Sequence, residues 1–307
     1  MGTSPDLAKA ARVIAEKALG RDPGPMASAK SNSHSVYVGP DVVVKIIDAN
    51  RHSRLNREIA LAPHLPAGLT APLLGHGVHR LETHELRYAC YARVPGTTPG
   101  IGMRGVDRPT AQLLAEQAVQ RLGELHSWTP APSAEQALRE PLDHGGLVGR
   151  AALYADIEKI TAVDRDGTVP RPLLDGLGVI AEHAPLRAQT VVPVHADCHW
   201  GNWLASGPTL TALLDFEWAR FGEPADDWFF LIRFSGPHME TVLGVIARAT
   251  TTSPELLRAQ CEVREAAHIA ADLRIALADP GSRTAMAAER LRGLAELIVG
   301  RYWWRRR

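Results

Sequence analysis

The chain has 307 residues, which is enough for one large domain or for a domain of two lobes that each have a core. Hydrophobic residues make up 45% and charged residues 22%, as in ordinary globular proteins. The formal net charge is zero and the pI is about 7.2, so no basic excess indicates a nucleic-acid partner. No apolar run predicts a membrane span or a signal peptide.

The cysteines lie far apart in the chain, at Cys90, Cys198 and Cys261. They form no C-x-x-C pair and no even-numbered disulfide framework, which favours a reducing cytoplasm. The basic and aromatic C-terminus, 301–307, is predicted to be the end of an amphipathic helix, with contact to an anionic surface as the alternative.

The first third of the chain is predicted to be rich in β-strands. An amphipathic helix comes first, with Ser4 as its N-cap, Pro5 at its first position and Gly20 as its stop. Two strands, a helix and a further strand are then expected, in this order, at residues 35–38, 41–47, 51–62 and 86–94. A segment rich in Pro and Gly, 95–100, marks a boundary between lobes.

The rest of the chain is predicted to be mainly helical. Helices are expected at residues 110–128, 144–162, 172–184, 226–234, 238–250, 254–277 and 284–303. A short β region around 190–216 interrupts them. The predicted fold class is therefore α+β, with a small β-rich N-lobe (1–94) and a larger α-helical C-lobe (95–307). A nucleotide would lie in the cleft between the lobes.

The β region carries the groups that phosphoryl transfer requires. Asp197 and Asn202 are five residues apart, and Asp215 follows at the end of a mostly apolar run. A tight loop and then a hairpin would bring the three side chains together. One carboxylate must orient a substrate hydroxyl and accept its proton, while an amide oxygen and a second carboxylate hold magnesium against the phosphates. The pattern predicts Asp197 in the first role, and Asn202 and Asp215 in the second.

Each of these residues also has a purely structural interpretation. Asp197 could cap a turn, Asn202 could be a turn residue, and Asp215 could be an N-cap at a strand end. Glu217 lies two residues beyond Asp215, so along a continuing strand its side chain would point the same way. It is a candidate for a second metal ion or for substrate contact, and a solvated acid is the alternative.

Three segments resemble the aminoglycoside phosphotransferase and choline kinase family, which shares the protein-kinase-like fold. Residues 195–202 with Asp215 are close to H-G-D-x-H-x-x-N…D. Residues 122–126 resemble L-x-x-L-H, and residues 222–227 resemble G-D-P-x-x-D. Gly, Leu and Pro of the family are replaced by, in this order, Ala196, Cys198 and Trp200. The resemblance spans nearly the whole chain and implies a two-lobed kinase fold.

The resemblance also implies nucleotide-binding residues in the N-lobe. Lys45 would contact the α- and β-phosphates and pair with Glu58 of the next helix, with two ordinary surface charges as the alternative. The loop over the phosphates would contain Ser31, Ser33 and Ser35. It lacks the glycines of protein kinases, but hydroxyl and N–H groups can bind phosphate.

Further site residues follow from the same resemblance. The backbone of an inter-lobe hinge would bind the base, over the residues Tyr91, Ala92, Arg93 and Val94. His195 and Asp227 would be structural residues within the site. Zinc binding by His195 and His199 is an alternative, although their spacing suits a helix and this segment reads as a loop.

The acceptor pocket is expected among the C-terminal helices. There Glu265 and Asp272, together with Glu217, would receive a cationic substrate, and Trp200 could stack on a ring. Solvated acids and a core tryptophan are the alternatives.

The predicted function is a magnesium-dependent kinase that transfers the γ-phosphate of ATP or GTP to a hydroxyl of a small molecule. An antibiotic of the aminoglycoside, basic peptide or nucleoside type, with a resistance role, is the first expectation. A sugar, amino alcohol or nucleoside metabolite is the alternative acceptor, and a kinase-fold binding module without catalysis is the alternative function. The missing Gly-rich loop argues against a protein kinase. The sequence leaves the oligomeric state open.

Overall fold

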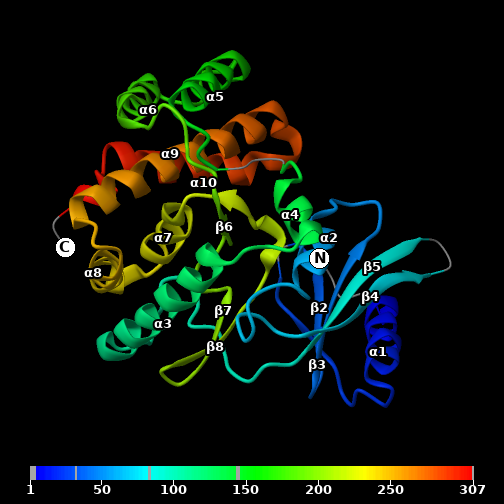
Figure 1. Ribbon diagram of the computed structural model, residues 1–307. Coiled ribbons are helices and arrows are strands. Elements are labelled where there is room, and N and C mark those ends of the chain that lie inside the picture. The colour runs from blue at the N-terminus through cyan, green and yellow to red at the C-terminus, as the bar shows by residue number, and fades with distance from the viewer. Residues whose placement is uncertain (1–4, 32, 82–83, 143–145, 306–307) are drawn as a thin grey trace.

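The computed structural model describes residues 5–31, 33–81, 84–142 and 146–305 (Figure 1). Its N-terminal part is a five-stranded antiparallel sheet of strand order β1-β2-β3-β5-β4. The strands are β1 (Ala27–Ala29), β2 (Ser35–Val38), β3 (Val42–Asp48), β4 (Leu73–Arg80) and β5 (Glu85–Ala92). The predicted strands are confirmed as β2, β3 and β5. The sequence did not predict β1, which has three residues, or β4, which contains two glycines and two histidines.

Different helices cover the two faces of this sheet. Side chains alternate along β3, so Val44 and Ile46 point to one face and Lys45 to the other. Helix α1 (Pro5–Leu19) packs on the first face, where its Ile14 joins the same core cluster as Val44 and Ile46. Helix α2 (Arg54–Leu61) packs on the second face through Leu55. Lys45 therefore faces α2.

Helix α1 ends as its sequence predicts. Gly20 follows its last residue with a φ of 67°, a left-handed conformation that glycine adopts without steric cost. The N–H of Gly20 donates to the carbonyl of Glu16 at 2.8 Å and so closes the last turn. Ser4, the predicted N-cap, lies outside the described residues.

The C-terminal part is mainly helical. Its helices are α3 (Arg108–Ser127), α4 (Pro132–Arg139), α5 (Arg150–Val163), α6 (Arg171–His183), α7 (Pro224–Arg233), α8 (Met239–Thr250), α9 (Pro254–Ala278) and α10 (Pro280–Ile298). Apart from α4, each of these helices was predicted. Helix α4 has eight residues, too few to show a helical period clearly.

Two predicted helix ends were wrong. Helix α5 begins at Arg150 rather than near residue 144, because Gly149 before it has a φ of 147°; residues 143–145 lie outside the described part of the chain. The last helix ends at Ile298. Arg301 then has a φ of 45°, and a short 3-10 helix follows that turns Trp303 back into the core.

Helix α9 lies at the centre of the helical lobe. It contacts α5, α6, α7, α8 and α10, and it buries Leu257, Cys261 and Leu273. Because neighbours surround this helix, two of its acidic residues, Glu265 and Asp272, are buried as well. No described helix is long and apolar enough to cross a membrane.

Short strands lie between the N-terminal sheet and the helices, as Figure 1 shows. β6 (Val192–Val194) pairs with β9 (Arg220–Gly222), and β7 (Trp203–Ser206) pairs with β8 (Thr209–Leu213). The two pairs share the loop that runs from β6 to β7, residues 195–202. This loop carries the predicted catalytic motif.

Candidate active site

The β7–β8 hairpin brings Asn202 next to Asp215. Its register places Trp203 opposite Leu213, so the residues just outside the hairpin also lie side by side. The N–H of Leu214 donates to the carbonyl of Asn202 at 2.8 Å. Two residues that are thirteen apart in the sequence are thus joined by backbone geometry.

The side chain of Asn202 is fixed by Asp197. Its Nδ2 donates to the backbone carbonyl of Asp197 at 2.8 Å and to the Asp197 carboxylate at 3.2 Å. The amide oxygen of Asn202 is then the atom left to bind a metal ion. Burial, and after it the negative charge of Asp215, raise the pKa of the Asp197 carboxyl well above its usual value.

Asp227, near the start of α7, fixes the catalytic loop by hydrogen bonds to its backbone. Its carboxylate accepts from the N–H of His195 at 3.1 Å and from the N–H of Ala196 at 2.7 Å. The ring of His126, in the last turn of α3, lies 2.9 Å from the same carboxylate. Ala196, at a position where the family has glycine, has a φ of 61° that these bonds maintain.

Both ring nitrogens of His195 are used within the loop. Nε2 donates to the carbonyl of Leu214 at 2.9 Å, and Nδ1 accepts from the N–H of Asp197 at 3.2 Å. Burial lowers the pKa of His195 and favours this neutral form. The alternative of a zinc site made by His195 and His199 is therefore wrong, because His195 has no ring nitrogen left for a metal.

Lys45 reaches across the cleft to both predicted partners. Its Nζ lies 2.8 Å and 2.9 Å from the two carboxylate oxygens of Glu58, and 3.2 Å from Oδ1 of Asp215. Burial lowers the pKa of Lys45, but the neighbouring carboxylates outweigh burial and hold it above its usual value. Burial raises the pKa of Asp215, and the Lys45 ammonium outweighs that effect in the opposite direction. This cluster is therefore charged.

The predicted phosphate loop connects β1 to β2. Ser35 lies in β2 opposite Ile46, next to the position of Lys45. Ser33 Oγ lies 2.8 Å from Nδ1 of His34, and Ser31 Oγ accepts from the N–H of His34 at 3.4 Å. The side chains of Ser31 and Ser33 thus bind His34, and their contact with phosphates stays a prediction.

The predicted hinge has two backbone groups already engaged. The N–H of Ala92 donates to Pro72 at 2.8 Å, and the N–H of Arg93 donates to Asp41 at 2.9 Å. Among the described residues, none accepts from the N–H of Val94. Tyr91 is buried behind this segment, with Lys45 Nζ 6.0 Å from its ring centre. Within the predicted hinge, a nucleotide base would find its N–H donor at Val94.

The predicted orientation of Glu217 was wrong. The chain does not continue as a strand, because Asp215 has a φ of 70° and residues 216–218 form a 3-10 helix, η1. Glu217 is buried, and its Oε1 lies 2.7 Å from Nε2 of His34. Oxygen atoms of Glu217, Asp215 and Glu58 nevertheless lie within 4.8 Å of one another. Such a set of oxygen donors suits magnesium.

A family model described as the phosphotransferase enzyme family matches residues 27–279. The chain belongs to this family. The protein is therefore a phosphotransferase that uses an alcohol group as acceptor. No curated protein matches the sequence significantly.

Solved structures show where this fold occurs. The phosphotransferase superimposes on the GDP complex of aminoglycoside 2'-phosphotransferase-IIIa with a TM-score of 0.74 at 17% identity, over 97% of this chain and 100% of that one. For the gentamicin complex of APH(2'')-IIa, the TM-score is 0.68 at 14% identity, over 96% and 97%. For the macrolide 2'-phosphotransferase MphH from Brachybacterium faecium, it is 0.61 at 21% identity, over 91% and 97%. Identities this low show a shared fold alone.

A pocket of about 550 Å³ lies beside Asp197 in the phosphotransferase. Helices α7, α9 and α10 supply most of its lining, and Trp218 and Arg220 close it near the catalytic loop. The pocket contains apolar rings as well as charges, among them Phe230 and Phe234 of the α7 region. An acceptor hydroxyl could reach Asp197 from here.

Trp200 does not line this pocket. Its side chain is fully buried, and its Nε1 donates to the carbonyl of Leu231 and to Ser235 Oγ, both at 3.0 Å. The prediction that Trp200 stacks on the acceptor was wrong. The residue instead anchors the catalytic loop to α7 and fills the core beneath it.

Glu265 and Asp272 line the pocket, but each is already paired. Glu265 lies 2.6 Å from Arg233 and accepts from the indole N–H of Trp303 at 2.7 Å. Asp272 lies 2.6 Å from Arg290. Contact of these two acids with a cationic substrate stays a prediction, and such a substrate would meet Arg233 and Arg290 beside them.

Three arginines of this pocket, Arg220, Arg233 and Arg290, were not predicted from the sequence. Arg220 is buried beside Asp197, and its Nη2 lies 3.8 Å from Asp226 Oδ2 without a hydrogen bond to any described residue. Arg233 lies in the last turn of α7, and Arg290 lies in α10. Neither position carries a sequence signal that would place it in a pocket.

Proposed function

We propose that the phosphotransferase transfers the γ-phosphate of ATP or GTP to a hydroxyl group of a small organic molecule. The observation that carries the proposal is the convergence of Asp197, Asn202, Asp215 and Lys45 beside a pocket, from segments that lie up to 170 residues apart. In this proposal residues 1–94 bind the nucleotide, and residues 95–307 supply the catalytic loop and the acceptor pocket.

Asp197 acts on the acceptor. Its carboxylate lines the pocket and would orient the hydroxyl and accept its proton as the new bond to phosphorus forms, which is typically worth about 10²–10⁴ in rate. The bond to Asn202 and the bracing by Asp227 hold Asp197 in place without any substrate. His195, with both nitrogens used, is a positioning residue.

The nucleotide would be bound by residues of the N-lobe and by the metal ligands. Lys45 would contact its phosphates, with Glu58 keeping the ammonium in position. Asn202 and Asp215 would hold Mg²⁺, with Glu217 behind them, and the bound ion would neutralise charge that develops on the phosphates. The serines Ser31, Ser33 and Ser35 would cover the phosphates. The N–H of Val94 and the carbonyls of the hinge would bind the base.

The charges of the pocket favour an acceptor with little positive charge. Besides Asp197, each carboxylate that lines the pocket lies within 4 Å of an arginine nitrogen: Glu265, Asp272, Glu289 and Glu296. A polycation would have to compete with Arg233 and Arg290 for these carboxylates. Arg220 adds a buried positive charge next to Asp197 and could receive an acceptor oxygen.

The proposed acceptor is therefore a hydroxylated molecule with an apolar or aromatic face. A weakly charged antibiotic, with a resistance role for the enzyme, is our first candidate, since similar folds include a macrolide phosphotransferase as well as aminoglycoside phosphotransferases. A sugar or nucleoside metabolite is the second. The free cysteines Cys90, Cys198 and Cys261 support a cytoplasmic location.

The experiment is a magnesium-dependent assay of ADP or GDP release with two panels of acceptors. One panel contains polycationic aminoglycosides and basic peptides, and the other contains hydroxylated molecules with at most one positive charge. We expect acceptor-dependent turnover from the second panel. Turnover confined to polycations would contradict the proposed acceptor class and keep the kinase. Nucleotide binding without transfer to any acceptor would favour a binding module.

A further inference from the structure

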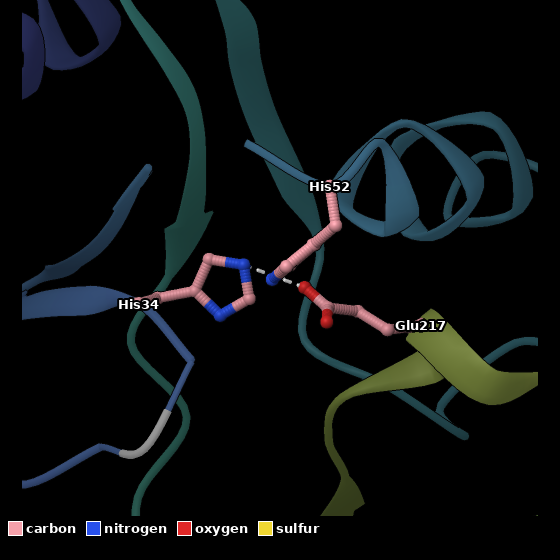
Figure 2. A group of neighbouring side chains, drawn as sticks. All are labelled: His34, His52 and Glu217. Carbon is pink, nitrogen blue, oxygen red and sulfur yellow. Dashed lines mark ion pairs between the residues drawn. The ribbon is translucent and has the colours of Figure 1, made fainter. Parts of the chain in front are cut away.

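Two histidines and a glutamate meet at the edge of the active site. His34 comes from the loop between β1 and β2, His52 precedes α2, and Glu217 lies in η1 (Figure 2). One ligand atom of each lies within 4.8 Å of the other two. The side chains of His34 and Glu217 are 1% and 2% exposed, so this group is built into the protein interior.

The facing atoms of this cluster have no hydrogen bonds. His34 Nε2 and Glu217 Oε1 form an ion-pair contact of 2.7 Å, but neither atom has a hydrogen-bond partner among the described residues, and neither does His52 Nδ1. Buried polar atoms without partners cost free energy and call for an explanation. Three such atoms that face one another would all be satisfied by one cation.

Neighbouring residues orient two of the three side chains, His34 and Glu217. Ser33 Oγ lies 2.8 Å from Nδ1 of His34, so an Nδ1–H that donates to it leaves the lone pair of Nε2 directed at the cluster. The other oxygen of Glu217, Oε2, lies 3.8 Å from Arg54, whose guanidinium stacks on the Trp218 ring at 4.5 Å. Arg54 therefore orients the carboxylate from behind, as partners of metal ligands do.

We propose that His34, His52 and Glu217 form a binding site for a divalent transition-metal ion of the zinc type. Two imidazoles and one carboxylate are ligands that zinc accepts, whereas magnesium requires oxygen donors. Bonds of about 2.0–2.1 Å place tetrahedral ligands roughly 3.3 Å apart, a spacing that small side-chain rotations would produce here. A fourth position stays open. His52, the part-exposed member of the cluster, borders a cavity of about 150 Å³.

The ion would connect three segments of the active site. It would fasten the predicted phosphate loop, through His34, to the residue before α2 and to the segment that follows Asp215. Loops that cover nucleotides usually have low local stability, so such a bond would change how readily this loop opens. This consequence rests on the proposed nucleotide site, but the metal site itself does not.

The test measures metal binding rather than catalysis. Metal-free protein in excess Mg²⁺ is titrated with Zn²⁺ against a chromophoric chelator, and with Co²⁺ while its visible absorption is followed. We expect one tight ion per chain. His52→Ala should weaken binding by about 10²-fold or more, and Ser33→Ala by about 10–100-fold. His76→Ala, which removes an exposed histidine of β4, and Asn202→Ala, which alters the predicted magnesium site, should leave the affinity unchanged.

Equal zinc affinity in His52→Ala and the wild type would overturn the proposal, and so would a wild type that binds no zinc. If His52→Ala does not fold, X-ray absorption of the zinc-loaded wild type decides, because two imidazole ligands are expected and one or none contradicts the site. Failure here leaves the phosphotransferase assignment untouched, since no readout depends on phosphate transfer.

Discussion

The catalytic loop and the acceptor pocket are built in opposite ways. In the loop, backbone bonds and one short hairpin fix Asp197, Asn202 and Asp215 within twenty residues of sequence. In the pocket, side chains from α7, α9 and α10 meet through ion pairs such as Arg233 with Glu265. The loop is fixed by local geometry and the pocket by packing at long range. One scaffold can therefore keep its chemistry while its pocket changes.

The largest expected effect concerns the brace of the loop. Asp227→Ala removes the acceptor of two backbone N–H groups and the partner of His126, and leaves them buried without compensation. We expect a loss of about 3–5 kcal/mol in the free energy of unfolding, measured by urea denaturation. Asp175→Ala, at an exposed ion pair, should change it by less than about 0.5 kcal/mol. Similar losses in both variants would contradict the role of Asp227.

A second prediction concerns the nucleotide side of the loop. Lys45→Ala leaves Glu58 and Asp215 without their shared cation. We expect kcat/KM for the nucleotide to fall by about 10²-fold, or about 2.7 kcal/mol, in steady-state assays. Lys9→Ala, which removes an exposed lysine of α1 on the other face of the sheet, is the matched control and should not change it. An unaltered Lys45→Ala enzyme would show that the phosphates bind elsewhere.

The pocket offers a graded comparison. Glu265 is buried and binds both Arg233 and Trp303, whereas the Glu296 side chain is 57% exposed and lies 3.5 Å from Arg233. Glu265→Gln should destabilise the protein by about 1–3 kcal/mol, and Glu296→Gln by less than about 0.5 kcal/mol. Thermal unfolding measures both. The reverse order would mean that Glu265 is not the central ion pair of this pocket.

The smallest expected effect is a pH dependence of stability centred on the loop. The pKa of His195 is lowered by burial in the folded protein, and that of Asp227 is lowered because its partners outweigh its burial. At these two groups the unfolded chain binds more protons than the folded one in acid, so their contribution to stability falls, whereas the raised pKa of Asp197 acts in the opposite direction. The loss should begin below about pH 6.5 from His195 and steepen below about pH 4 from Asp227. A pH dependence of the urea midpoint between pH 7 and pH 5 that is the same in His195→Gln and in the wild type would contradict the contribution of His195.

The catalytic loop could be predicted from the sequence better than the acceptor pocket. The Lys45–Glu58 pair could be anticipated from the family resemblance, which implies a lysine of a strand paired with a glutamate of the next helix. Asn202 and Asp215 could be brought together, because one hairpin joins them. Glu217 was misplaced because Asp215 adopts a left-handed conformation that ends the strand, and a period of two gives no warning of it.

The pocket could not be predicted from local sequence patterns. Trp200 was assigned to the substrate by its position beside Asp197, but its burial depends on how α7 packs under the loop. The acids of α9 were predicted as a receptor for cations. These acids form ion pairs with Arg233 and Arg290, which belong to other helices. No local sequence pattern predicts that these arginines reach the pocket. Long-range packing decides such charges.

The most direct test of the account compares Asp197→Ala with the wild type in magnesium-dependent ADP or GDP release, beside nucleotide affinity measured by calorimetry. We expect acceptor-dependent turnover to fall by about 10²-fold or more while nucleotide affinity changes little, because Asp197 lines the acceptor pocket and Lys45 is the residue proposed to hold the phosphates. Near-normal turnover in Asp197→Ala would show that another group accepts the proton, and it would contradict the central assignment.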